Sequence, residues 1–190
     1  MSGKNESNRI EVRLAGEGGQ GMILAGVILA EAAAIYAGKN VVQTQTYGPE
    51  ARGGSSKAEV IISDDEIDYP EVINADILVA MSQEACDKYA SNLKKDGLLI
   101  VDSEKVRRVP LTNAVKLPIT RMATEATGKS ITANVVSLGV LVGLTNLVSR
   151  TAIQKAIIAR APKGTEELNQ KALERGLFEA EALLAIKEKA

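Results

Sequence analysis

The sequence contains no histidine, no tryptophan and a single cysteine, Cys86. The lack of histidine excludes Ser-His-Asp and Cys-His catalytic arrangements and zinc sites that use histidine ligands. One thiol cannot hold an iron–sulfur cluster, which usually takes four thiolates, and it cannot form an internal disulfide. Any redox centre that serves this chain must therefore be carried by another polypeptide.

An excess of charge of either sign is also missing. The chain has 23 Lys and Arg against 24 Asp and Glu, a net charge of -1 and a pI of about 5.7. With this balance the chain has no overall positive potential that would attract the phosphate backbone of a nucleic acid. Four tyrosines and one phenylalanine are too few rings for a platform on which bases stack. We therefore do not expect nucleic acid as a partner.

The first eight residues are polar and lack the apolar stretch of a secretory signal, so we expect a flexible tail over residues 1–8 and a cytoplasmic location. The 190 residues are 45% hydrophobic and 25% charged, the balance of a globular domain with its own core. No linker or internal repeat divides the chain. We therefore expect a single domain over residues 9–188.

One uncharged run, from Ser130 to Ser149, could be taken for a membrane helix because Gly139 and Gly143 in it have the G-x-x-x-G spacing. Polar residues nevertheless recur along the run, at Ser130, Thr132, Asn134, Ser137, Thr145, Asn146 and Ser149. Most of them fall on one third of a helix circumference, and the sequence offers no aromatic belt. The run therefore predicts a helix docked against the protein, and we do not expect a membrane partner.

Hydrophobic periodicity predicts alternating strands and helices. The expected strands are residues 9–15, 41–47, 58–63, 75–81, 97–101 and 114–117, and the expected helices are residues 22–37, 84–93, 131–148, 152–160 and 166–187, the last with a possible break at Gly176. Ser82 is the expected N-cap of the second helix. This order indicates an α/β fold: a three-layer, Rossmann-like domain with a mainly parallel sheet and a helical C-terminal part.

A glycine-rich loop joins the first strand to the first helix. Gly16, Gly18 and Gly21 satisfy the G-x-G-x-x-G pattern in the strand-to-helix context in which backbone N–H groups cradle phosphates. A dinucleotide-binding loop also requires an acidic residue about 20 positions further on. Residues 36–46 contain none, which disfavours NAD. On the pattern alone, a tight turn with a purely structural role is an equally good interpretation.

A second loop follows the next strand, from Tyr47 to Gly54. Pro49 restricts the backbone, and Glu50 and Arg52 place a carboxylate and a planar guanidinium on one short segment. A solvated turn with a local ion pair is the alternative. Because both loops should leave the carboxyl edge of one sheet, we expect a shared binding site there. Its candidate residues are Gly16, Gly18, Gly19, Gln20, Gly21, Tyr47, Glu50, Arg52, Gly53 and Gly54; we expect no catalytic residue and no metal ligand.

Two further groups of residues favour structural roles. Cys86 falls in a predicted helix beside Asp87 and, with no histidine to activate it, should be a buried structural thiol. The basic residues Lys105, Arg107 and Arg108 should lie in a solvated loop, where Glu104 partly offsets their charge.

The sequences of the two loops, Gly16 to Gly21 and Tyr47 to Gly54, resemble those of the gamma subunits of 2-oxoacid:ferredoxin oxidoreductases. The resemblance extends over nearly the whole chain and includes the strand that ends at Ser82, with Asn134, Gly139, Asn169 and Gly176 in the helical half. The tyrosine-glycine-proline-glutamate form of the second loop and the acidic turn that ends in Asp68, Tyr69 and Pro70 are most similar to the 2-oxoglutarate branch. The loop of the pyruvate branch typically has Phe-Gly and an Arg-Arg pair.

This resemblance implies a complex that decarboxylates a 2-oxoacid, passes electrons to ferredoxin and transfers the acyl group to coenzyme A. It implies that thiamine diphosphate with magnesium belongs to alpha and beta subunits and that iron–sulfur clusters belong to beta or delta subunits. The gamma chain is implied to close over the active centre and help receive coenzyme A, with no bound cofactor of its own. Glu50, Arg52 and the glycine loop would make these contacts.

Two other functions stay open at this point. The chain could be a stand-alone regulatory module whose glycine loop carries an adenine cofactor. It could also be a purely structural subunit that supports a catalytic pair.

Overall fold

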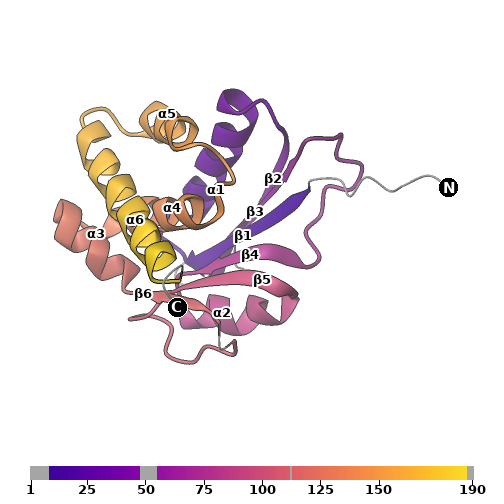
Figure 1. Ribbon diagram of the computed structural model, residues 1–190, viewed down its shortest axis with the longest axis horizontal. Helices are drawn as coiled ribbons and strands as arrows, with labels where there is room; N and C mark the ends of the chain where they lie inside the picture. The colour runs from indigo at the N-terminus through magenta and orange to yellow at the C-terminus, as the bar shows by residue number, and fades with distance from the viewer. Residues whose placement is uncertain (1–8, 48–54, 112, 188–190) are drawn as a thin grey trace.

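The computed structural model describes residues 9–47, 55–111 and 113–187, and contains a six-stranded sheet in the order β2-β3-β1-β4-β5-β6 (Figure 1). The strands are β1 (Ile10–Glu17), β2 (Asn40–Thr46), β3 (Ser55–Ser63), β4 (Ala75–Ala80), β5 (Leu93–Asp102) and β6 (Val115–Leu117). β1, β4, β5 and β6 are parallel, whereas β3 is antiparallel to both β1 and β2. The predicted α/β class with a mainly parallel sheet is confirmed, and β3 is the strand that departs from parallel order.

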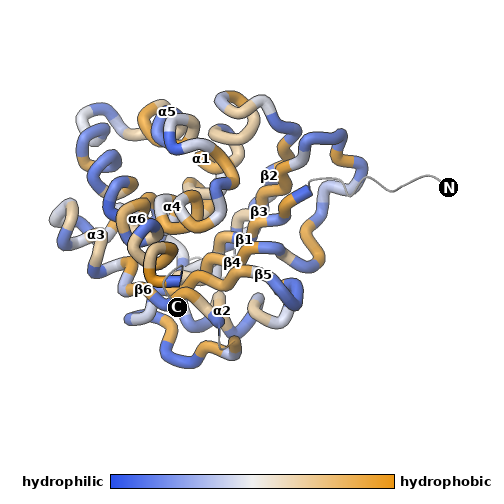
Figure 2. The backbone as a smooth tube through the Cα atoms, viewed as in Figure 1, coloured by the Kyte–Doolittle hydropathy of each residue, from blue (hydrophilic) through white to orange (hydrophobic). Residues whose placement is uncertain are grey.

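Helices cover both faces of this sheet, which makes the predicted three layers. They are α1 (Met22–Glu31), α2 (Gln83–Tyr89), α3 (Ile119–Thr127), α4 (Ala133–Thr145), α5 (Arg150–Arg160) and α6 (Glu166–Lys187), with short segments η1 (Ala32–Tyr36), η2 (Ala90–Asn92) and η3 (Ser130–Thr132). Figure 1 places α2 on one side of the sheet and α1, α4, α5 and α6 on the other. Figure 2 shows the hydrophobic strands between these layers.

The alternation of side chains along β1 explains why it contributes to a hydrophobic cluster on each face of the sheet. Val12 and Leu14 are buried in the main cluster with α1 and α4, whereas Ala15 is buried in the smaller cluster with α2. Ser82 caps α2 as predicted, because its hydroxyl accepts a hydrogen bond of 3.2 Å from the backbone N–H of Ala85.

The uncharged run forms η3 and α4, and α4 is a docked helix with every residue from 133 to 142 buried. Within the described part of the chain, no helix is both long and apolar enough to cross a bilayer. The break predicted at Gly176 is wrong, because α6 runs from Glu166 to Lys187 without interruption. Gly176 is buried against α4, so the close approach of two helices rather than a chain break explains this glycine.

Helix α3 is the element that the sequence analysis missed. It begins directly after Pro118 and ends at Gly128, which has the left-handed φ of 74° typical of a helix C-terminus. Ile119, Met122 and Ala123 are buried. Their i, i+3, i+4 spacing is the signal that would have predicted a helix there.

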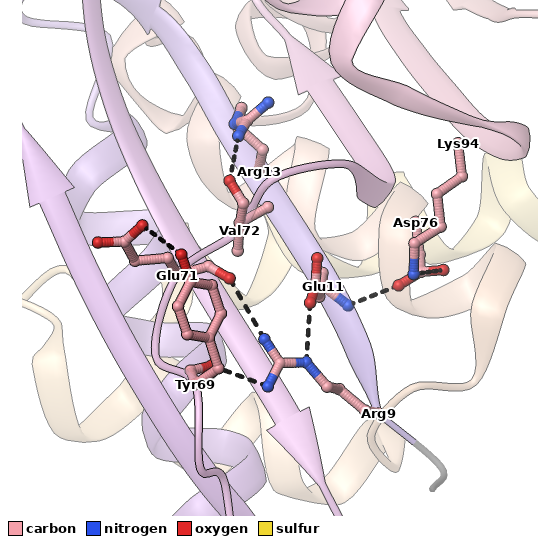
Figure 3. Close-up of polar contacts among 8 residues, drawn as sticks. All are labelled: Arg9, Glu11, Arg13, Tyr69, Glu71, Val72, Asp76 and Lys94. Atoms are coloured by element: carbon pink, nitrogen blue, oxygen red, sulfur yellow. Dashed lines mark hydrogen bonds and ion pairs between the residues drawn. The ribbon is translucent and has the colours of Figure 1, made fainter. Parts of the chain in front are cut away.

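Two arginines of β1 and its N-terminal flank hold the acidic connection between β3 and β4 against the sheet (Figure 3). Arg9 donates through Nη1 to the carbonyl of Tyr69 at 2.8 Å and through Nη2 to that of Glu71 at 3.3 Å. Arg13 donates through Nη2 to the carbonyl of Val72 at 2.9 Å. This acidic connection is therefore anchored to the sheet through its backbone carbonyls.

Candidate functional site

The two candidate loops begin at the same edge of the sheet. β2 runs in the direction of β1 because β3 is antiparallel to both, and Lys57 of β3 pairs with Ala15 on one side and Thr46 on the other. The glycine loop and Tyr47 therefore follow strand ends that are separated only by the width of β3. We call residues 16–21 together with Tyr47 the rim.

The glycine loop requires glycine at two positions because of its backbone. Gly19 has a φ of +92° and Gly21 a φ of +74°, conformations that residues with a side chain rarely adopt. A Cβ on Gly19 would meet open space, so only its φ demands glycine there. A Cβ on Gly21 would lie 2.7 Å from Nδ2 of Asn134, so a side chain there would also force the Asn134 amide of α4 to shift.

Gln20 is turned toward the protein and holds the loop in place. Its Oε1 accepts a hydrogen bond of 2.7 Å from the N–H of Glu17, and its Nε2 donates to the carbonyl of Met81 at 3.1 Å. A Cβ on Gly16 would lie 2.3 Å from Gln20 Oε1, so this glycine leaves room for the amide. Gln20 and Gly16 therefore act as positioning residues of the rim.

A cavity of about 490 Å³ lies where the rim meets α1. Its lining residues are Gly18, Gly19, Gly21, Met22, Ile23, Leu24, Val27, Tyr47, Ser56 and Arg160. Gly21 is the N-cap of α1, and no side chain of the described residues caps the helix. Among the described residues, the lining combines free N–H groups at the start of α1 with the Tyr47 and Ser56 hydroxyls and the Arg160 guanidinium, and it includes no carboxylate. This environment favours anions.

Ser56 and Arg160 are lining residues that the sequence analysis did not identify. Arg160 comes from the end of α5, and its Nε donates to Oε2 of Glu31 on α1 at 2.5 Å, which holds its side chain near α1. Ser56 donates to the carbonyl of Gly16 at 3.4 Å. Because these residues reach the rim from distant parts of the chain, no local sequence signal marks them.

Tyr47 is placed as expected, at the end of β2 with 68% of its surface exposed. The other candidates of the second loop, Glu50, Arg52, Gly53 and Gly54, lie outside the described residues. The structure therefore brings Gly18, Gly19 and Gly21 together with Tyr47 around one cavity, whereas Gly16 and Gln20 do not line it.

Cys86 is buried in α2, as predicted for a structural thiol. Burial raises the pKa of its thiol, and the negative charge of Asp87 raises it further. A thiol with a raised pKa is a poor nucleophile and a poor metal ligand at neutral pH. A chain with one buried thiol and no histidine does not fit the ligation of an iron–sulfur cluster.

The basic loop after β5 has a different charge arrangement from the one expected. Arg107 and Arg108 are exposed, and Arg108 pairs with Asp87 at 3.0 Å. Glu104 instead pairs with Arg121 of α3 at 3.3 Å. The basic charge is thus offset by Asp87 of α2.

Comparison with known proteins gives a consistent result. The sequence profile described as pyruvate ferredoxin/flavodoxin oxidoreductase matches residues 11–179. The 2-oxoglutarate synthase subunit KorC of Methanocaldococcus jannaschii is 50% identical over 188 residues, which cover 96% of this chain and 100% of the relative. The common gamma subunit of the pyruvate/ketoisovalerate oxidoreductases of Thermococcus kodakarensis is 33% identical over 175 residues, 87% of this chain and 94% of the relative.

A solved structure agrees with this match. The gamma subunit of a keto/oxoacid ferredoxin oxidoreductase from Geobacter sulfurreducens superimposes with a TM-score of 0.82 at 49% identity, over 91% of this chain and 99% of that one. The resemblance to gamma subunits of 2-oxoacid:ferredoxin oxidoreductases is thereby confirmed. On fold, sequence profile and relatives together, the chain belongs to the pyruvate ferredoxin/flavodoxin oxidoreductase family.

Proposed function

We propose that this chain is the gamma subunit of a 2-oxoglutarate:ferredoxin oxidoreductase and that its rim receives coenzyme A in the assembled enzyme. The observation that carries the proposal is the cavity shared by Gly18 and Gly19, which follow β1, and Tyr47, which follows β2. Backbone donors at the start of α1 and the Arg160 guanidinium suit the phosphates of a nucleotide. Among the described residues of the lining there is no carboxylate that would repel those phosphates.

The choice of 2-oxoglutarate is supported by the relatives. The 2-oxoglutarate synthase subunit from M. jannaschii is 50% identical to this chain, whereas the pyruvate/ketoisovalerate subunit from T. kodakarensis is 33% identical. In the reaction that we propose, oxidative decarboxylation of 2-oxoglutarate releases carbon dioxide, passes electrons to ferredoxin and leaves the succinyl group on coenzyme A.

The chain contributes a binding surface to this reaction and no reacting group. Alpha and beta subunits would carry thiamine diphosphate and magnesium, and beta or delta subunits the iron–sulfur clusters that reduce ferredoxin. This division is supported by a sequence with no histidine and one buried cysteine. We place the complex in the cytoplasm.

Within this proposal the loop after Tyr47 completes the rim. Arg52 would hold a phosphate of coenzyme A through its planar guanidinium, with Glu50 orienting it and Gly53 and Gly54 allowing close approach of the backbone. Gln20 and Gly16 would keep the glycine loop in the shape that presents its N–H groups.

The main test measures coenzyme A kinetics of the assembled complex with a viologen acceptor. Arg52→Ala should raise the KM for coenzyme A about tenfold, because a charge-assisted hydrogen bond to phosphate is worth about 1.5–3 kcal/mol. Arg107→Ala, at an exposed arginine of the loop after β5, is the matched control and should leave KM unchanged. An unchanged KM in the Arg52 variant would remove the binding role and favour a purely structural subunit.

A second measurement separates the remaining functions. The complex should oxidise 2-oxoglutarate faster than pyruvate or 2-oxoisovalerate in the presence of coenzyme A. The isolated chain should show no turnover, and calorimetric titration of it with NAD, NADP and FAD should give no heat of binding. Micromolar affinity of the isolated chain for a dinucleotide would instead indicate a stand-alone nucleotide-binding module.

A further inference from the structure

Glu31 and Arg160 form an ion pair between two helices beside the 490 Å³ cavity at the rim, here called the rim cavity. Glu31 is the last residue of α1 and Arg160 is the last residue of α5, and Nε of Arg160 donates to Oε2 of Glu31 at 2.5 Å. Among the described residues that line the rim cavity, Arg160 is the one cation, and Glu31 is not a lining residue. Glu31 therefore contacts the cation of the cavity without being part of the cavity wall.

The guanidinium of Arg160 keeps donors that a ligand can use. Glu31 takes the inner nitrogen, Nε, and the two terminal nitrogens make no hydrogen bond or ion pair within the described residues. A guanidinium is planar and can donate from Nε to one partner and from its terminal nitrogens to another at the same time. The ion pair therefore leaves Arg160 able to bind an anion.

The exposure of this pair indicates that its main role is not stability. The side chain of Arg160 is 50% exposed and that of Glu31 is 12% exposed. Ion pairs that water reaches contribute little to the free energy of unfolding. Loss of the pair should therefore leave the fold intact and change mainly where the Arg160 side chain lies.

Arg160 also lines a second cavity, so its orientation matters. This cavity of about 220 Å³ has Leu24, Ile28 and Ile157 in its wall. A long side chain that nothing holds samples many rotamers. Without Glu31, the guanidinium would be free to lie over either cavity.

We propose that Glu31 is a positioning residue of the rim cavity: it holds Nε of Arg160 so that the terminal nitrogens are presented to a phosphate of coenzyme A. This inference rests on the proposed function and adds to it the residue that orients its cation. A side chain that must be ordered when a ligand binds lowers the affinity, whereas one that is already held does not. Glu31 therefore strengthens coenzyme A binding although it carries the same sign of charge as the ligand.

The sign of the effect separates positioning from simple charge repulsion. Glu31 places a negative charge near the cavity, so its removal should by Coulomb repulsion alone tighten the binding of phosphates. Positioning predicts the opposite, weaker binding when Glu31 is lost. Glu31→Gln adds a second distinction, because the amide oxygen can still accept the hydrogen bond from Nε but carries no charge.

Two measurements on the assembled complex test the proposal: coenzyme A kinetics with a viologen acceptor, and calorimetric titration with coenzyme A. Glu31→Ala should raise both the KM and the dissociation constant about fivefold, because one released arginine must then be ordered on binding. The value of kcat should not change, because the chain contributes no reacting group. Glu31→Gln should retain most of the natural affinity.

Arg160→Lys tests the geometry of the cation. An ammonium keeps the charge but lacks the planar set of nitrogens, so it cannot hold Glu31 and a phosphate in the way that a guanidinium does. This variant should raise the dissociation constant about fivefold, since part of a charge-assisted hydrogen bond is lost. Glu181→Ala is the matched control: Glu181 pairs with Arg150 at the other end of α5, at 3.7 Å, and its loss should change neither constant.

Two results would overturn the inference while the proposed function stands. One is a natural or lowered dissociation constant in Glu31→Ala, and the other is natural affinity in Arg160→Lys, which would show that charge alone is sufficient. The proposed function itself expects Arg160→Gln to raise the KM about tenfold. A natural KM in Arg160→Gln would overturn the inference, and a natural KM in Arg52→Ala as well would overturn the proposed function. Circular dichroism and thermal melts confirm that the variants are folded.

Discussion

Gly176 of α6 and Gly139 of α4 face each other where the two helices cross. A Cβ built on Gly176 would lie 2.9 Å from the Cα of Gly139 and 2.2 Å from the carbonyl oxygen of Val136. The helices therefore touch through their backbones, and this contact anchors the C-terminal helix to the uncharged helix α4.

Gly176→Ala should destabilise the protein. In an exposed helix the change would gain about 1 kcal/mol of helix propensity, but here the new methyl group must displace the α4 backbone, which costs about 1–3 kcal/mol or more. We expect a lower free energy of unfolding by urea denaturation. Glu174→Gly, on the exposed part of the same helix, should cost only about 1 kcal/mol of propensity. A stabilised Gly176→Ala variant would contradict the close crossing.

Gly21→Ala should be more damaging than Gly19→Ala. Both positions have positive φ, so an L side chain adds strain of about 1–2 kcal/mol at each. Only at Gly21 does the new Cβ also lie 2.7 Å from Nδ2 of Asn134, whose amide donates to the Gly21 carbonyl at 3.3 Å. Thermal melts of the two variants should therefore show the larger loss of Tm for Gly21→Ala. Equal losses would mean that the contact with α4 is unimportant.

Arg13 and Glu59 form a buried ion pair between β1 and β3. The guanidinium, 4% exposed as a residue, lies 2.6 Å from the Glu59 carboxylate and 5.2 Å from the centre of the Tyr89 ring. Glu59→Leu should cost about 3–5 kcal/mol because it leaves Arg13 buried without its counter-ion. Replacing both residues together, as Arg13→Met with Glu59→Leu, should cost less than the sum of the single changes. Additive losses in this double-mutant cycle would exclude coupling between the two residues.

The buried thiol should make stability depend on alkaline pH. Because burial and the charge of Asp87 raise the pKa of Cys86, the unfolded chain loses its proton at a lower pH than the folded protein. This contribution to stability is complete below the unfolded pKa of about 8.5 and is lost as pH rises toward the folded pKa. Cys86→Ala should flatten the decline in free energy of unfolding above about pH 8.5. An equally steep decline in this variant would assign the effect to other groups.

Tyr69 should titrate later than an isolated tyrosine. Its hydroxyl donates to Oε2 of Glu71 at 2.9 Å, and this hydrogen bond, together with the negative charge of Glu71, raises the pKa of Tyr69. Glu71→Gln should move part of the ultraviolet phenolate transition to lower pH. Glu66→Gln, at another exposed acid of the same connection, is the control. An unmoved transition in Glu71→Gln would show that the hydroxyl is not held by Glu71.

Much of the fold could be predicted from local patterns. The glycine loop between β1 and α1, the capping by Ser82 and the burial of Cys86 follow from composition and spacing within short segments. The direction of β3 could not be predicted in this way, because alternating apolar residues do not indicate whether a strand is parallel or antiparallel to its neighbours. The break at Gly176 was predicted wrongly because glycine both destabilises a helix and allows two helices to pack closely.

The candidate site was predicted in part. The glycine loop and Tyr47 were named from sequence and meet at one cavity. The sequence did not predict that Gln20 bonds to Met81, or that Ser56 and Arg160 line the cavity. The partners of these three residues are far away in the chain.

By itself, the sequence determined the α/β class, the order of most elements and the family, because these depend on composition, periodicity and motifs that are local. Only the tertiary structure decided that Asn134 packs on Gly21, that Gly139 and Gly176 let α4 and α6 touch and that β2 is the terminal strand of the sheet. Those features depend on which distant segments come to lie side by side, and that is settled by packing of the whole chain.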